Sequence, residues 1–158
     1  MDWGKWLEKW GMSNLKLKTG FLEADFSPQT ADRDAAWDLY VELVTRVTTQ
    51  PVDPDHGDEA AALASVHRLF QLTRKTLRRH GPDCGAFARV AIVVLNQVIR
   101  PFTAKWHRRR LAGDFDRAEA RADFRRELAA LQNDLRRYMA MLADMARVED
   151  LTDLTAGP

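Results

Sequence analysis

Cysteine is nearly absent from the sequence: Cys84 is the only one among 158 residues. A single cysteine excludes an internal disulfide, and a chain built without disulfides fits a reducing compartment. The N-terminus also lacks the separate basic and apolar regions of a signal peptide, because tryptophans, lysines and acids are mixed there. We therefore expect a cytoplasmic location.

The motifs of common catalytic and metal sites are missing as well. There is no glycine-rich phosphate loop, no HExxH, no paired CxxC and no GxSxG. The acidic loop that begins at Asp53 is not an EF-hand, because its sixth and twelfth positions hold Asp58 and Ala64. The histidines lie on separate predicted elements without metal-ligand spacing; they are His56, His67, His80 and His107. The sequence therefore predicts no enzyme activity, no cofactor and no metal.

Cys84 is the strongest remaining candidate for a catalytic group. It opens the helix that follows Asp83, where a helix N-terminus stabilises a thiolate, and His80 is close in sequence. A nucleophile also needs an oriented base and a pocket, and no third member of such a site is evident. A packed thiol is the preferred interpretation.

Long apolar runs are also lacking. The longest covers residues 90–99 and contains Asn96 and Gln97, which suits a buried core helix better than a membrane span. The wider stretch 87–111 is apolar nearly all round before it ends in cations, so we expect other helices to surround it. Pro101 removes a backbone hydrogen bond to Gln97 and predicts a kink.

Helical periodicity accounts for most of the chain. Further helices are predicted over about 27–50, 58–80 and 116–149. The last contains a seam of apolar residues spaced four and three apart, namely Phe124, Leu128, Leu131, Leu135, Tyr138, Leu142 and Met145. The predicted fold is mostly α, a bundle of about four long helices over 27–149 with a flexible tail over 150–158.

The first 26 residues are predicted to form an appendage to this bundle. Residues 2–10 predict a short amphipathic helix with Trp3, Trp6, Leu7 and Trp10 on one face. Residues 14–26 alternate in a strand-like way, and the parity changes at Gly20, which predicts a small β-hairpin.

The tryptophan face of the first helix has three alternative destinations. It can pack on its own bundle, or it can bind a protein partner or a second copy of the chain. A membrane surface is disfavoured, because Lys5 and Lys9 are opposed by Asp2 and Glu8.

Charge is distributed unevenly along the chain although the net charge is only +1. Residues 66–110 carry eleven lysines and arginines against one acid, Asp83. Such an excess is either neutralised within the fold or forms a surface for an anion. The candidate polyanion-binding residues are Arg78, Arg79, Lys105, Arg108, Arg109 and Arg110. If the two helices that carry them are antiparallel neighbours, residues 78–79 and residues 105–110 lie at opposite ends of the pair, unless the kink at Pro101 brings them together.

Two functions follow as hypotheses. The first is a non-enzymatic protein–protein interaction module, an adaptor or complex subunit able to self-associate, which binds through Trp3, Trp6, Leu7 and Trp10. The alternative is binding of nucleic acid or another polyanion through the basic region 66–110. The residues identify no known family.

Overall fold

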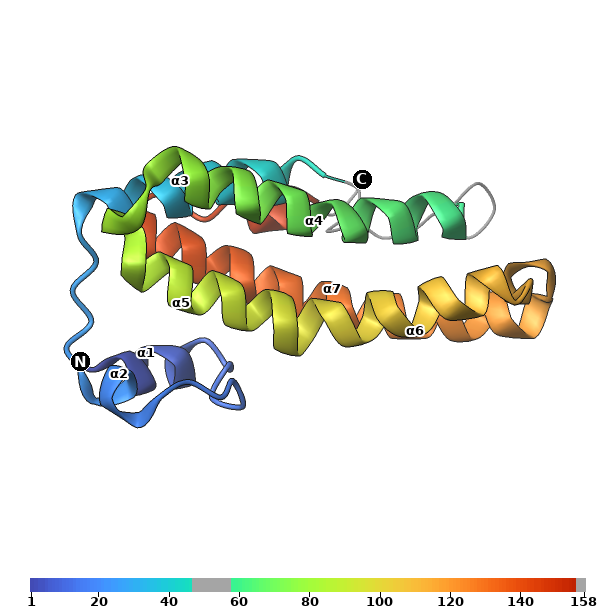
Figure 1. Cartoon of the computed structure of the whole chain (residues 1–158), viewed down its shortest axis with the longest axis horizontal. Helices are drawn as coiled ribbons and strands as arrows, with labels where there is room; N and C mark the ends of the chain where they lie inside the picture. Colours follow the sequence, from blue (N-terminus) through green and yellow to red (C-terminus); the bar gives the residue numbers. More distant parts are fainter. Residues whose placement is uncertain (47–57, 156–158) are drawn as a thin grey trace.

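The computed structural model describes residues 1–46 and 58–155, and these are predominantly helical (Figure 1). The α-helices are α1 (Trp3–Lys9), α2 (Thr19–Glu23), α3 (Thr30–Val44), α4 (Glu59–His80), α5 (Gly85–Val94), α6 (Arg100–Leu111) and α7 (Ala118–Ala146). The prediction of a mostly α fold is therefore confirmed. The acidic loop discussed above falls largely on residues 51–57, which lie outside the described part.

The long helices form two layers (Figure 1). α3 and α4 make one layer, and α5, α6 and α7 make the other, with α3 packed against α7 and α4 against α6. α6 and the first half of α7 extend as an arm beneath the N-terminal half of α4. Residues 1–26 form a small N-terminal lobe below α5, which Figure 1 shows in blue.

The predicted β-hairpin over residues 14–26 is wrong. The segment holds the short helix α2, and no strand occurs in the described ranges; one isolated bridge links Asp2 and Asp25. The Phe21 ring, on α2, stacks on Trp3 with 4.7 Å between ring centroids. The aromatic side chains of this segment, Phe21 and Phe26, thus pack on the tryptophans of α1 instead of lining one face of a sheet.

The central apolar helix continues past Pro101, and its axis changes direction where α5 gives way to α6 (Figure 1). A π-helical turn, η3 (Leu95–Ile99), joins α5 to α6, and the Arg100 N–H donates to the Leu95 carbonyl. Such a turn is one way in which a helix accommodates a residue that lacks an N–H. The Gln97 side chain binds the backbone of Lys16 instead, with its Oε1 accepting at 2.8 Å and its Nε2 donating at 3.0 Å.

The helical stretch Pro82–Leu111 has the length and hydropathy of a membrane span, a property that core helices of other proteins share. Its inner face is buried in the bundle through residues such as Phe87, Val94 and Ile99. Its outer face is less covered than predicted, because Ile92 is 44% exposed. This uncovered strip faces the N-terminal lobe.

A buried carboxylate fixes the start of α3 against the start of α5. Asp32 is 2% exposed, and its Oδ2 accepts from the Gln29 N–H at 2.9 Å to close a capping box. Its Oδ1 accepts from the Phe87 N–H at 2.9 Å. One side chain thereby satisfies the free N–H groups of two helices.

The predicted apolar seam of α7 is buried over its whole length, from Phe124 to Met145. Beyond α7 the chain turns back onto α3. The Tyr40 hydroxyl accepts from the Leu151 N–H at 2.5 Å and contacts Asp150 Oδ1 at 3.2 Å. The first residues of the predicted tail are therefore attached to the bundle.

Candidate functional site

The tryptophan face that the sequence offers to a partner lies inside the protein. Trp3, Trp6 and Leu7 are 3%, 1% and 1% exposed, and Trp10 is half-buried. Trp6 stacks on Phe26, with 4.5 Å between ring centroids. Of the three destinations considered for this face, the structure shows the first, packing on the chain's own bundle.

The predicted polyanion-binding residues fall into two sets at opposite ends of the molecule. Arg78 and Arg79 are in the last turn of α4, where Arg79 Nη1 lies 3.6 Å from Asp38 Oδ2. The other set, Lys105, Arg108, Arg109 and Arg110, is on the far half of α6. The structure does not bring the two sets together (Figure 1).

Internal ion pairs occupy part of the second set. Lys105 pairs with Glu127 at 2.5 Å. Arg109 Nε donates to Asp114 Oδ2 at 2.6 Å, and this hydrogen bond, with the charges of Arg109 and Arg117, holds the pKa of Asp114 below its usual range. Lys105 and Arg109 are therefore already matched by acids.

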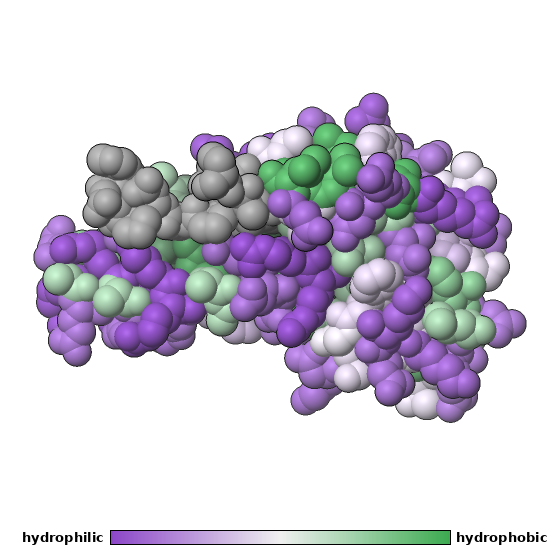
Figure 2. All heavy atoms as spheres, turned by 180° about the vertical axis from the view of Figure 1, so that it is seen from behind, coloured by the Kyte–Doolittle hydropathy of each residue, from purple (hydrophilic) through white to green (hydrophobic). Residues whose placement is uncertain are grey.

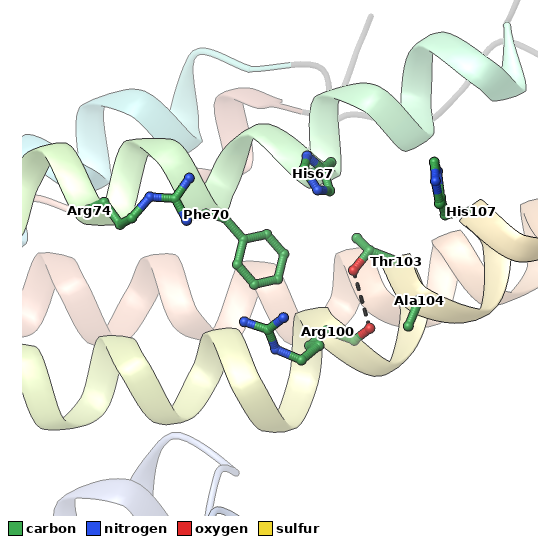
Figure 3. Close-up of a pocket in the computed structure, with 7 residues that line it drawn as sticks. All are labelled: His67, Phe70, Arg74, Arg100, Thr103, Ala104 and His107. Carbon is green, nitrogen blue, oxygen red and sulfur yellow. Dashed lines mark hydrogen bonds between the residues drawn. The ribbon is translucent and has the colours of Figure 1, made fainter.

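A different group of basic side chains meets in a groove between α4 and α6 (Figure 3). His67 and Arg74 are seven residues apart on α4, and Arg100 and His107 are seven residues apart on α6. Seven residues are nearly two helical turns, so each pair lies on one helix face. Because the helices run in opposite directions, the two arginines lie toward one end of the groove and the two histidines toward the other.

Two adjoining hollows make up this groove, with volumes of about 280 and 320 Å³. They share His67, Thr103 and His107, and the second hollow adds Arg68 and Arg110. We call the two hollows together the cationic groove. Its lining contains four arginines and two histidines, and no Asp or Glu of the described residues lines either hollow.

Arg100 is held in place without a carboxylate. Its Nε donates to Asn96 Oδ1 at 2.9 Å, and its guanidinium lies 4.8 Å from the centroid of the buried Phe70 ring. Within residues 1–46 and 58–155, no acid forms an ion pair with Arg68, Arg74 or Arg110 at the other positions of the groove. Uncompensated positive charge of this kind attracts anions.

Sequence analysis missed most of this groove. Of the residues it proposed, only Arg110 lines it, and His67, Arg68, Arg74, Arg100 and His107 were not chosen. One signal was present in the sequence: on each of two helices a histidine and an arginine are seven residues apart, which places them on one helix face. The pairing of α4 with α6 at this position was not readable from the sequence.

Figure 2 shows the opposite side of the molecule, which is covered mainly by hydrophilic side chains, with an apolar patch beside the residues drawn in grey. In the described residues, no group of three or more His, Cys, Asp or Glu side chains is placed to hold a metal ion.

Cys84 is enclosed by the fold. It is 1% exposed, its Sγ donates to the Gly81 carbonyl at 3.1 Å, and burial, together with the negative charge of Asp32, raises the pKa of the thiol. A buried protonated thiol is a poor nucleophile.

We therefore expect Cys84 to react with Ellman's reagent roughly 100-fold more slowly in the native protein than in guanidinium-unfolded protein at the same mildly alkaline pH. The absorbance of the released thiolate measures both rates. Native and unfolded rates of similar size would show that the thiol is accessible.

The structure is thus that of an α-helical protein with a groove lined by basic side chains between two antiparallel helices. No protein-family model, no curated protein and no solved structure matches the chain.

Proposed function

We propose that the protein is a non-enzymatic binding module that holds a phosphate-rich polyanion, namely a nucleic-acid backbone, in the cationic groove. The observation that carries the proposal is the lining of four arginines and two histidines without an acid. The polyanion hypothesis drawn from region 66–110 is kept, but of the residues first proposed only Arg110 belongs to the cationic groove.

The dimensions of the groove support an extended ligand. Its lining runs along α4 from Leu63 to Arg74, which at 1.5 Å per residue is about 16 Å. The phosphates of one duplex strand follow one another at about 3.4 Å along the axis. The groove is therefore long enough to contact more than one phosphate of a strand, and each guanidinium can donate two parallel hydrogen bonds to one of them.

The groove offers little for reading a base sequence. Its one aromatic side chain apart from the histidines, Phe70, is 7% exposed and covered by Arg100. Stacking platforms for single strands need an accessible ring face. We infer binding to the backbone, independent of base sequence.

Fluorescence anisotropy with a labelled duplex over a series of salt concentrations tests the proposal. We expect binding that weakens steeply with salt, since each phosphate contact releases counterions. The double substitution Arg74→Ala, Arg100→Ala removes two contacts and is expected to reduce the slope of log K against log salt by about 1.8.

The matched control is Arg78→Ala, Arg79→Ala, which removes the same charge from the last turn of α4. We expect it to change the slope by less than half as much. Absence of binding at low salt would refute the proposal, and equal losses in the two variants would refute the assignment to this groove.

Protein binding, with the chain as an adaptor or complex subunit, is the second proposal, and one observation favours it. Trp37 and Val41 on the outer face of α3 are 45% and 36% exposed, and exposed tryptophan is frequent in protein interfaces. A chain that binds only proteins would leave the labelled duplex free at every salt concentration.

A further inference from the structure

A second groove lies between the N-terminal lobe and the side of α5 that the bundle leaves uncovered. Figure 1 shows the lobe below α5. Its volume is about 990 Å³, at the upper end of the range for ligand sites. We call it the lobe groove. Ligand sites are frequent where two packed units of a protein meet.

The lobe groove has an apolar floor. Phe21 and Leu17 come from the lobe, and Ile92 and Val93 from α5; Ile92 is 44% exposed. Small residues leave this floor open, namely Gly20, Ala24, Ala86 and Ala88. Apolar surface of this extent is unfavourable in water and gains free energy when a hydrocarbon chain covers it.

Apart from Trp3, the remaining side chains that line the groove are cationic. Lys16, Lys18 and Arg89 stand at its margin, and no acid of the described residues lines it. No ion pair holds any of the three within the described ranges. Arg89 lies over the Phe21 ring at 5.3 Å, so positive charge adjoins the apolar floor directly.

The backbone at the margin is fixed, which makes this arrangement a preformed site. Both backbone groups of Lys16 are hydrogen-bonded to the Gln97 side chain across the groove boundary. The Trp3 ring is held between Phe21 and Phe26, at 4.7 and 4.6 Å between centroids. A ligand would therefore meet a surface that needs little rearrangement.

We propose that the lobe groove binds one molecule of a long-chain fatty acid. The hydrocarbon chain lies along Phe21 and Ile92, and the carboxylate is bound by Lys18 and Arg89. A neutral lipid would leave these cations without a counterion, and a nucleotide would place polar ring edges on a floor that has no polar side chains. The proposal is independent of the cationic groove.

Tryptophan quenching by dibromostearate, below its micelle concentration, tests this proposal, because bromine quenches on contact and Trp3 lines the groove. We expect saturable quenching with a stoichiometry of one. The exposed pair Lys18→Glu, Arg89→Glu should raise the Kd about tenfold or more, because repulsion replaces attraction. The corresponding brominated alcohol should bind both proteins with equal affinity.

Two further arms separate the alternatives. The Arg74→Ala, Arg100→Ala variant should bind the acid like the native chain, which keeps this test distinct from that of the duplex. Circular dichroism should show unchanged folding of the Lys18→Glu, Arg89→Glu variant. The proposal is overturned if quenching does not saturate, if the charge reversal leaves the Kd unchanged, or if the chain binds phosphatidylglycerol vesicles but not the free acid.

Discussion

Replacing Trp6 by alanine is expected to lower the free energy of unfolding by about 3–5 kcal/mol, the range for deleting a large aromatic side chain from a core. Trp6 is 1% exposed and packs on Trp3 and Phe26. Its Nε1 donates to Asp144 Oδ2 at 2.6 Å, so the substitution also removes the partner of a partly buried carboxylate on α7. Urea denaturation followed by circular dichroism measures the loss.

Two variants separate the causes of this loss. Trp6→Phe keeps most of the apolar surface and removes the hydrogen-bond donor with a small part of the ring system, so about 1–2 kcal/mol should be lost. Trp37→Ala removes a tryptophan that is 45% exposed and should have an effect of about 1 kcal/mol or less. If Trp6→Ala were no worse than Trp37→Ala, the lobe would contribute little to the stability of the bundle.

Replacing Asp32 by alanine is expected to lower the free energy of unfolding by about 2–4 kcal/mol. The substitution leaves the N–H groups of Gln29 and Phe87 without their acceptors, and each of these bonds is to a charged group. The Phe87 N–H is buried, so water does not readily replace the lost partner. Chemical denaturation again provides the measurement.

The matched control is Asp34→Ala, an exposed acid two residues further along α3, for which we expect a change within about 0.5 kcal/mol. Asp32→Asn keeps one acceptor oxygen and should lie between the two. Equal stability of the Asp32 and Asp34 variants would show that the carboxylate does not join the two helices.

The long helices could be predicted from the sequence because each has one apolar face that repeats over several turns. The seam from Phe124 to Met145 is the clearest example, and every one of its seven residues is buried. The segment 14–26 could not be predicted in this way. Its apolar residues do not repeat on one face over several turns, and the positions of Phe21 and Phe26 are set by contacts with Trp3 and Trp6 of α1.

The candidate sites could be predicted from the sequence less well than the helices, because each site depends on which helices are neighbours in the fold. The cations of the cationic groove stand out only once α4 is known to lie against α6. The tryptophans near α1 are spaced so that they share one helix face, as in a helix that binds a partner. Because α7 packs beside this face, Trp6 contacts Asp144 of the same chain. Periodicity shows which face of a helix is apolar. It does not show what packs against that face.

The π turn that joins α5 to α6 has a consequence for the cationic groove. A turn of this kind contains one residue more than an α-helical turn, so every side chain after it is rotated by about 100° around the helix axis. Arg100 and His107 both follow the turn. Their orientation toward α4 therefore depends on one surplus residue, and a deletion within 95–99 would turn both away from Arg74 and His67 without altering the residues themselves.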